Sequence, residues 1–182
     1  MSIMSTSTEL TFATSPAEMS EADFVALFGG VYEHSPWVAE QTWQQGLDAA
    51  QNTPAGLSAA MQKEVAAADR TRLMALINAH PDLAGKAAVR GELTAESTSE
   101  QAGAGISECT AEEFEQFQQY NAAYKARFGF PFIMAVKGSN RHKILAAFVE
   151  RIENNAEAEY QQALNEINKI ARFRLDAIAG SE

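Results

Sequence analysis

Apolar residues recur at helical spacing along most of the chain, and short polar breaks with glycine or proline separate the expected helices. A first helix is predicted after the capping-box pattern Ser20-x-x-Asp23, and a second opens at Ser35-Pro36-Trp37. A break at residues 51–56 precedes an apolar stripe that runs to His80. The positions that define these helices are Phe24, Leu27, Phe28, Val31, Leu57, Met61, Val65, Leu73, Leu76 and Ile77.

The second half of the chain continues this pattern. Thr110-x-x-Glu113 is a second capping box, and the aromatic stripe behind it is typical of core packing rather than of a cofactor site. Helices over about residues 140–152 and 156–179 close the chain. The residues expected to face inward are Phe114, Phe117, Tyr120, Tyr124, Ile144, Leu145, Phe148, Val149, Tyr160, Leu164, Ile167, Ile170, Ala171, Leu175 and Ile178.

The pattern predicts an all-α protein. It contains no βαβ alternation, no internal repeat and no sustained heptad. We expect a single-domain helical bundle of roughly eight helices, because 182 residues suit one domain of ordinary size. The Ser/Thr-rich residues 1–16 are expected to form a flexible leader, and residues 17–179 the domain.

Residues 81–107 interrupt the helical pattern with four glycines and several Ser and Thr residues. They indicate a long loop, or short helices joined by turns, and such segments in compact domains are commonly functional. Pro81 disfavours the α conformation at His80, so His80 should end a helix and project into a cleft. This loop-rich segment is therefore the expected active-site region.

Residues 128–138 are a second interruption, with two glycines and a proline among apolar residues. They predict a turn and an extended piece whose backbone can approach a ligand. A plain buried connector is the alternative.

Composition narrows the class of partner. Fourteen Lys and Arg residues against 24 Asp and Glu give a formal net charge of −10, which disfavours nucleic acid and anionic membranes as partners. A small anionic substrate stays compatible, because a few cations can reverse the field inside a cleft. Cys109 is the one cysteine, so no intrachain disulfide forms, as is usual in a reducing compartment. With no secretory signal, no apolar run long enough for a membrane span and no peroxisomal Ser-Lys-Leu-type ending, we expect a cytoplasmic protein.

The candidate chemistry centres on acid–base residues. His34, His80 and His142 lack metal-ligand spacing, and no P-loop, dinucleotide-binding motif or nucleophile elbow occurs. A Cys109 nucleophile with His80 as its base is an alternative. What remains is a site without metal or cofactor, with His80 and Glu100 as the proton-handling pair.

Ser97, Glu100 and Arg174 have two interpretations each. Ser97 and Gln101 can supply hydrogen bonds to a ligand, but Ser97-x-x-Glu100 is also a capping-box pattern, and both roles are compatible. Arg174 lies at the edge of the apolar stripe of the last helix. Its guanidinium either snorkels to solvent or reaches a polar pocket.

Four motifs in order resemble the 2-oxo-4-hydroxy-4-carboxy-5-ureidoimidazoline (OHCU) decarboxylase family. They are His80-Pro81-Asp82-Leu83-Ala84-Gly85-Lys86, Ser97-x-x-Glu100-Gln101-x-x-Ala104-Gly105, Phe128-Gly129-Phe130-Pro131-Phe132-Ile133, and Glu166-Ile167-x-Lys169-Ile170-Ala171-x-x-Arg174-Leu175. The resemblance covers about residues 17–178. Ile106 departs from it, since family members often carry leucine there.

The resemblance implies an all-helical homodimer that carries out the last step of urate breakdown to (S)-allantoin, a carboxy-lyase reaction without cofactor. It implies that His80 is the essential catalytic residue. The residues it places around the substrate are Pro81, Ser97, Glu100, Gln101, the backbone of Phe132, Ile133, Met134, Ala135 and Val136, and Arg174.

These residues suit the chemistry of decarboxylation. Loss of CO₂ leaves electrons on carbon, and the imidazolone ring of the substrate can delocalise them without a metal, pyridoxal or thiamine. We hypothesise that Glu100 lies near the substrate carboxylate and disfavours the charged ground state. His80 then delivers or relays the proton to one face of the ring, while Arg174 holds an anionic or carbonyl oxygen.

Two other classes of function compete with this one. A helical interaction module without catalysis would need an apolar groove and no convergence of the polar residues of 80–101. A metal-dependent hydrolase would instead bring the three histidines together.

Overall fold

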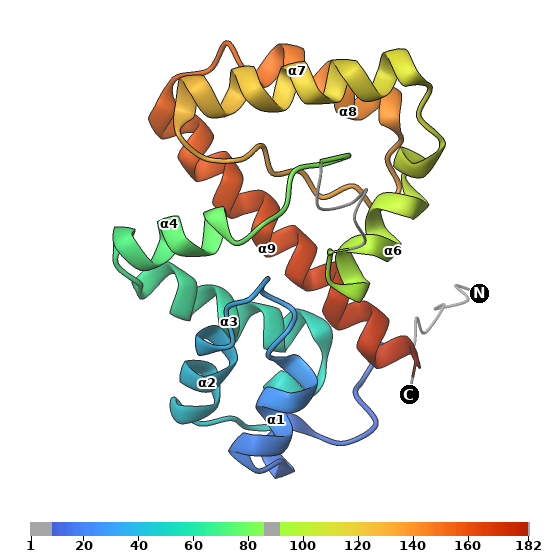
Figure 1. Ribbon diagram of the computed structural model, residues 1–182. Helices are drawn as coiled ribbons and strands as arrows, with labels where there is room; N and C mark the ends of the chain where they lie inside the picture. Colours follow the sequence, from blue (N-terminus) through green and yellow to red (C-terminus); the bar gives the residue numbers. More distant parts are fainter. Residues whose placement is uncertain (1–8, 86–91, 182) are drawn as a thin grey trace, which may run out of the picture. The chain divides into compact units, whose positions relative to one another are not determined.

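The computed structural model describes residues 9–85 and 92–181, and in these ranges it contains eight α-helices and no strand (Figure 1). The all-α prediction with roughly eight helices is confirmed. Contacts divide the chain into two compact units. The first comprises residues 1–31, 35–67 and 171–182, and the second comprises residues 32–34 and 68–170. Within the described ranges, no helix is both long enough and apolar enough to cross a membrane.

The first unit is built from α1 (Glu21–Phe28), α2 (Trp37–Gln44), α3 (Pro54–Ala67) and the end of α9 (Ala156–Ser181). The Ser20 side chain caps α1 by accepting a hydrogen bond from the Asp23 amide, as the capping pattern predicts. Phe12 is buried against Phe28, with ring centroids 5.0 Å apart. The leader expected over residues 1–16 is thus packed into this unit at Phe12, while its residues 1–8 lie outside the described range.

The second unit contains α4 (Arg70–Asn78), α6 (Ala95–Gly103), α7 (Ala111–Phe128), α8 (Arg141–Arg151) and the first part of α9. The described part of the expected loop-rich segment therefore holds a short helix, α6, and the 3-10 turn Ile106–Glu108. This matches the interpretation of short helices joined by turns. Lys86 and Gly91 of that segment lie outside the described residues.

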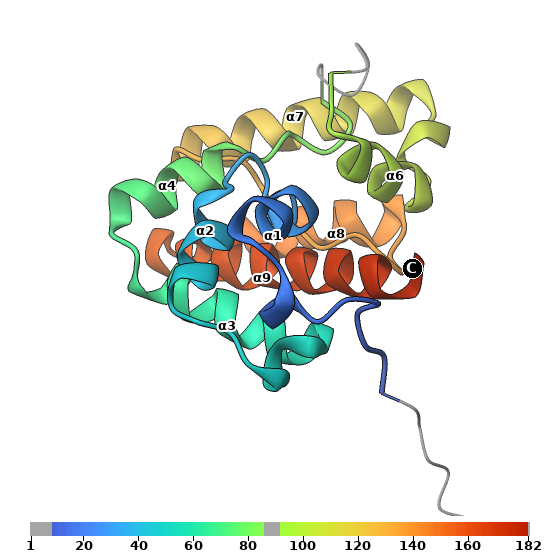
Figure 2. The ribbon, with the colours of Figure 1, turned by 90° about the horizontal axis from the view of Figure 1, so that it is seen from below.

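Phe117 and Tyr124 of the aromatic stripe of α7 are buried in the core of the second unit, as expected, whereas Phe114 and Tyr120 are partly exposed. The Tyr124 ring is packed edge to face with the rings of Phe132 and Phe148. Helix α8, to which Phe148 belongs, contacts α7 (Figure 2). The complete capping box of Thr110 and Glu113 begins α7.

Val149 was predicted to face inward, and this is wrong, because its side chain is 54% exposed. The buried face of α8 follows Ile144 and Phe148, four residues apart, and Val149 is turned about 100° from Phe148.

Candidate active site

His80 lies two residues beyond the end of α4, so the prediction that it terminates a helix is confirmed. Its ring is buried, and its Nδ1 is 2.9 Å from the carbonyl oxygen of Leu76. A carbonyl only accepts hydrogen bonds, so Nδ1 carries the hydrogen and donates it. In the neutral ring Nε2 is then the basic nitrogen, and this is the tautomer that a general base requires.

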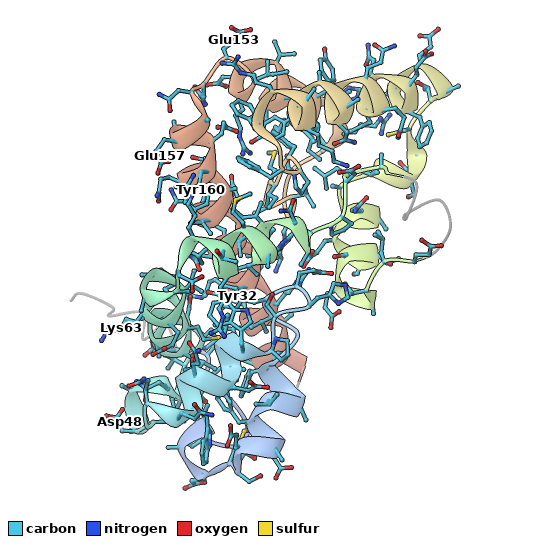
Figure 3. The ribbon with its side chains drawn as sticks, turned by 60° about the vertical axis from the view of Figure 1, so that its left-hand side comes forward. Tyr32, Asp48, Lys63, Glu153, Glu157 and Tyr160 are labelled. Carbon is cyan, nitrogen blue, oxygen red and sulfur yellow. The ribbon has the colours of Figure 1, made fainter. Side chains whose placement is uncertain are left out.

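Helix α4, which carries His80 at its end, is itself attached to α9 within the second unit. Asp69 caps α4 by accepting from the Arg72 amide. The Arg70 guanidinium lies over the Tyr160 ring, 4.0 Å from its centroid, and 3.2 Å from a carboxylate oxygen of Glu157. Glu157 and Tyr160 lie close together on α9 (Figure 3). These contacts fix the start of the helix whose end positions His80.

Three polar side chains of α7 hold the loop that follows His80. Gln118 donates to the Ala84 carbonyl at 2.7 Å, Asn121 donates to the Leu83 carbonyl at 2.9 Å, and Lys125 forms an ion pair with Asp82. The spacing i, i+3 and i+7 places these side chains on one face of the helix. We call Gln118, Asn121 and Lys125 the α7 clamp.

The backbone of this loop is tightly folded. Ala84 has a φ of 52°, a left-handed conformation that is unfavourable for alanine. A Cβ placed on Gly85 would lie 2.7 Å from the Asp82 Cβ, closer than real contacts allow. Glycine at position 85 is therefore required for this turn.

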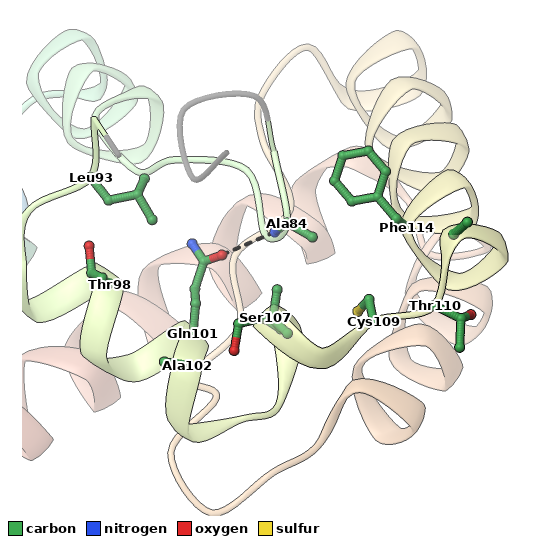
Figure 4. A pocket seen from close by; sticks show the side chains of 11 residues that line it. Ala84, Leu93, Thr98, Gln101, Ala102, Ser107, Cys109, Thr110 and Phe114 are labelled. Carbon is green, nitrogen blue, oxygen red and sulfur yellow. Dashed lines mark hydrogen bonds between the residues drawn. The ribbon is translucent and has the colours of Figure 1, made fainter. Parts of the chain in front are cut away.

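Gln101 connects α6 to the same loop. Its side chain is 6% exposed, and its Oε1 accepts from the Ala84 amide at 3.0 Å (Figure 4). A backbone amide only donates, so the acceptor atom is the oxygen and the NH₂ of Gln101 points elsewhere. Gln101 also borders a cavity of about 470 Å³. The other lining residues, mostly apolar, are Ala84, Leu93, Thr98, Ala102, Ile106, Ser107, Cys109, Thr110, Ala111 and Phe114.

Ser97 and Glu100 do not form the capping box that their spacing suggests. Thr94 is the N-cap of α6, and its hydroxyl oxygen accepts from the Ser97 amide at 3.2 Å. The Ser97 hydroxyl instead donates to Glu33, at 3.2 Å from each carboxylate oxygen. Glu100 is partly exposed on α6. Thus the capping-box interpretation is wrong, because a Thr-x-x-Ser pattern begins the helix one turn earlier.

Residues 132–136 run without regular secondary structure, as an interruption of the helical pattern predicts. Phe132 stacks on Phe148 with centroids 3.8 Å apart, and the Ile133 carbonyl accepts from Arg151 at 2.6 Å. Met134 and Ala135 are partly exposed, while Val136 is buried. The segment is therefore anchored at its start, and its middle retains some exposure.

Arg151 is paired with a buried carboxylate. Its Nε donates to Glu159 at 2.9 Å, and the Tyr124 hydroxyl donates to the same oxygen at 2.6 Å. Burial and the hydrogen bond to Glu159 raise the pKa of Tyr124, so this phenol stays protonated and donates.

Arg174 and Pro81 complete the predicted set. Arg174 lies in the first unit, where it is buried and its Nη1 donates to the Gly30 carbonyl at 3.1 Å. Its guanidinium does not snorkel to solvent. Pro81, directly after His80, is partly exposed. Ser97, Glu100 and Gln101 share α6, and Gln101 directly contacts the loop of His80.

The alternative chemistries find little support in the geometry. Burial, and then the negative charge of Glu113, raise the pKa of the Cys109 thiol, which disfavours a thiolate nucleophile at neutral pH. The side chains of His34 and His142 are 66% and 71% exposed, whereas His80 is buried. Among the residues that the structure describes, no three His, Cys, Asp or Glu side chains are grouped as metal ligands.

Comparison with known proteins decides the family. The sequence profile described as OHCU decarboxylase matches residues 17–176. The chain belongs to the OHCU decarboxylase family. The 2-oxo-4-hydroxy-4-carboxy-5-ureidoimidazoline decarboxylase of Halalkalicoccus jeotgali is 41% identical over 164 residues, which are 88% of this chain and 89% of that protein.

Two solved structures are similar to this one. The crystal structure of (S)-allantoin synthase has a TM-score of 0.69 at 30% identity. The match covers 90% of this chain, which spans about half, 52%, of that longer chain. The crystal structure of OHCU decarboxylase in the presence of (S)-allantoin has a TM-score of 0.65, covers 89% and 99% of the two chains, and at 22% identity shows the shared fold.

Sequence reasoning missed Glu33 and the α7 clamp of this family member. The clamp had a detectable signal, since Gln118, Asn121 and Lys125 form a polar stripe at helical spacing beside the aromatic one. Glu33 had none, because it is 64 residues from Ser97 and only the fold brings them together.

Proposed function

We propose that this member of the OHCU decarboxylase family converts OHCU to (S)-allantoin in urate breakdown, without a metal or organic cofactor. The observation that carries the proposal is the family match over residues 17–176. The relative from Halalkalicoccus jeotgali, whose name states this decarboxylase activity, supports it at 41% identity over most of both chains.

In the proposed reaction, the bond between the ring carbon and the carboxylate breaks and CO₂ leaves. The electron pair is delocalised through the imidazolone ring to the neighbouring carbon, which carries the ureido group, and a proton adds to that neighbouring carbon. The hydroxyl on the decarboxylated carbon loses its proton and becomes the carbonyl of allantoin, while the ring nitrogen takes up a proton from solvent. Nε2 of His80 is the atom that takes and returns the proton. Its suitability follows from the Nδ1–H bond to Leu76, which holds the ring in one tautomer and orientation.

Neighbouring residues would bind and orient the substrate. Glu100 lies near the substrate carboxylate and disfavours its charged ground state, so loss of CO₂ relieves the repulsion. Because Oε1 of Gln101 already accepts from Ala84, its NH₂ is the group that meets a substrate oxygen. Ser97, whose hydrogen is directed at Glu33, contacts the substrate as an acceptor.

The remaining proposed contacts come from Pro81, from Arg174 and from residues 132–136. Arg174 holds a substrate oxygen through its guanidinium. Pro81 and the backbone of Phe132, Ile133, Met134, Ala135 and Val136 shape the walls. The Arg151 bond to Ile133 supports this role, since it fixes the start of that segment.

The test is a coupled assay in which urate oxidase and hydroxyisourate hydrolase generate OHCU in place. Circular dichroism at the allantoin band should show rapid appearance of one enantiomer when this protein is added. The rate should be insensitive to chelators. A rate equal to the spontaneous one would contradict the proposal and favour an interaction module, and loss of activity with chelator would favour a metal enzyme.

The proposal includes a homodimer in the cytoplasm, as the family resemblance and the absence of a second cysteine suggest. Light scattering after size-exclusion chromatography should give twice the chain mass of 19.7 kDa. A monomeric mass would refute the dimer, and recovery of the protein in a membrane or organelle fraction would refute the location.

A further inference from the structure

Glu33 is a buried carboxylate to which the proposed reaction gives no role. Its side chain is about 1% exposed, and it lies in a three-residue segment of the second unit, next to His34 in a left-handed conformation with φ 47°. Tyr32 ties this segment to α9 by donating to Asn168 at 2.7 Å. Burying a carboxylate is unfavourable unless hydrogen-bond donors surround it. The groups that donate to Glu33 therefore indicate which part of the structure it stabilises.

Two of the donors come from the first turn of α6. The Thr94 hydroxyl donates to Glu33 at 2.9 Å, and the Ser97 hydroxyl donates at 3.2 Å. The Thr94 oxygen also accepts from the Ser97 amide, so one hydroxyl both caps the helix and bonds the carboxylate. A negative charge at this end of a helix is favourable for the helix dipole as well.

We propose that Glu33 is a positioning residue for the decarboxylase site, which acts by fixing the placement and rotation of α6. The inference rests on the proposed function for its effect on catalysis. Helix α6 has nine residues, too few to be stable alone, so contacts outside the helix determine where it lies. Glu100 and Gln101 follow Ser97 by three and four residues and therefore share its side of the helix.

The effect extends beyond α6. Gln101 accepts from the Ala84 amide, and the Ala84 carbonyl accepts from Gln118 of the α7 clamp. A continuous set of polar contacts thus runs from Glu33 through α6 to the loop that begins at His80. A small rotation of α6 would displace Glu100 and Gln101 together, and displacements of this kind are costly in a reacting site.

The test compares Glu33→Gln, Ser97→Ala and the double variant with the wild type. Glu33→Gln keeps the size of the side chain but removes the charge and one acceptor oxygen. We expect kcat to fall about 10- to 100-fold with little change in KM. The enantiomeric excess of (S)-allantoin should fall as well, because a displaced proton donor no longer selects one face of the ring. The double variant should lose no more than the worse single variant, because both break one interaction.

Two further variants distinguish a positioning role from a simple loss of stability. All rates are taken where denaturation curves show the variants to be fully folded. Glu96→Gln, an exposed change in the same turn of α6, should behave as the wild type. Glu33→Asp, which keeps the charge, should recover part of kcat.

Amide hydrogen exchange gives a readout independent of activity. In Glu33→Gln, exchange over residues 98–103 should speed up while exchange in α7 stays unchanged. A wild-type kcat and enantiomeric excess in Glu33→Gln, or wild-type exchange over α6, would overturn the proposal. If the wild type itself made no (S)-allantoin, the proposed function would fail, and the exchange experiment would still decide the role of Glu33.

Discussion

Three residues of the candidate site already use one polar atom to hold the chain together. Nδ1 of His80 donates to Leu76, Oε1 of Gln101 accepts from Ala84, and the Ser97 hydroxyl donates to Glu33. These bonds fix the tautomer of His80, the orientation of the Gln101 amide and the direction of the Ser97 hydrogen. The orientation of these three side chains therefore depends on hydrogen bonds within the protein as well as on residue type.

The sequence predicts individual residues well where the determinant is local. Proline after His80 ends the helix there, and the end of α4 at Asn78 agrees. The interpretation of Ser97 as a cap fails because Thr94, three residues earlier, is the N-cap of α6 without forming a capping box. Local spacing favours Ser97, because only Ser97-x-x-Glu100 has the glutamate of a capping box, whereas in the fold both hydroxyls donate to Glu33, which is distant in sequence.

Cys109 offers a direct test of covalent catalysis. Because burial raises the pKa of its thiol, we expect Cys109→Ser to keep kcat/KM within about twofold of the wild type. The measurement is the rate of (S)-allantoin formation. A loss of several orders of magnitude would instead support a cysteine nucleophile.

Arg174 is predicted to bind the substrate through its guanidinium. Arg174→Met keeps the apolar stem but removes the charged donors, and should weaken the binding of allantoin about 10- to 100-fold, as loss of a charge-assisted hydrogen bond does. Calorimetric titration measures this, and Arg172→Met, an exposed change on the same helix, is the control. Unchanged affinity in Arg174→Met would remove Arg174 from the pocket.

At the scale of elements, the loop after His80 is held by α6 on one side and by the α7 clamp on another. The neighbouring residues Ala84 and Gly85 are constrained differently: Ala84 by its backbone conformation and Gly85 by a lack of space. Ala84 adopts a conformation suited to glycine, while Gly85 has no room for a Cβ. The glycine-rich composition indicated a turn here, but which position is strained depends on contacts that only the fold supplies.

This contrast gives a matched pair of variants. Gly85→Ala should destabilise the protein by about 1–3 kcal/mol through overpacking against Asp82, and lower activity at least about tenfold by shifting the loop. Ala84→Gly should keep stability within about 1 kcal/mol, since relief of the left-handed strain offsets the added freedom of the unfolded chain. Urea denaturation and the allantoin assay measure both. Equal effects of the two changes would contradict this description of the loop.

A second element-level prediction concerns the buried pair beneath residues 132–136. Glu159→Gln leaves Arg151 without its countercharge, and should cost about 3–5 kcal/mol of unfolding free energy. The exposed pair Arg172–Asp176 is the control, and Asp176→Asn should cost no more than about 0.5 kcal/mol. Urea denaturation compares them. Similar small losses in both variants would show that the buried pair does not anchor this segment.

At the scale of the whole molecule, hydrophobic periodicity predicts the class and the number of helices, because each helix buries one apolar stripe. It does not predict the division into two units. The stripe from Leu57 to Ile77 reads as continuous, yet α3 ends at Ala67 and α4 begins at Arg70 in the other unit. Nor does it show that Phe12 packs on Phe28, since the apolar residues of the leader follow no helical period.

The central claim is that His80 handles the proton in OHCU decarboxylation, and one variant tests it most directly. In His80→Asn the side-chain amide can still donate to the Leu76 carbonyl, so the fold should be kept while the basic Nε2 is lost. The measurement is circular dichroism at the allantoin band with OHCU generated in place, after far-ultraviolet spectra establish that the variant is folded. We predict that (S)-allantoin forms no faster than it does spontaneously. A folded His80→Asn variant with wild-type activity would contradict the claim.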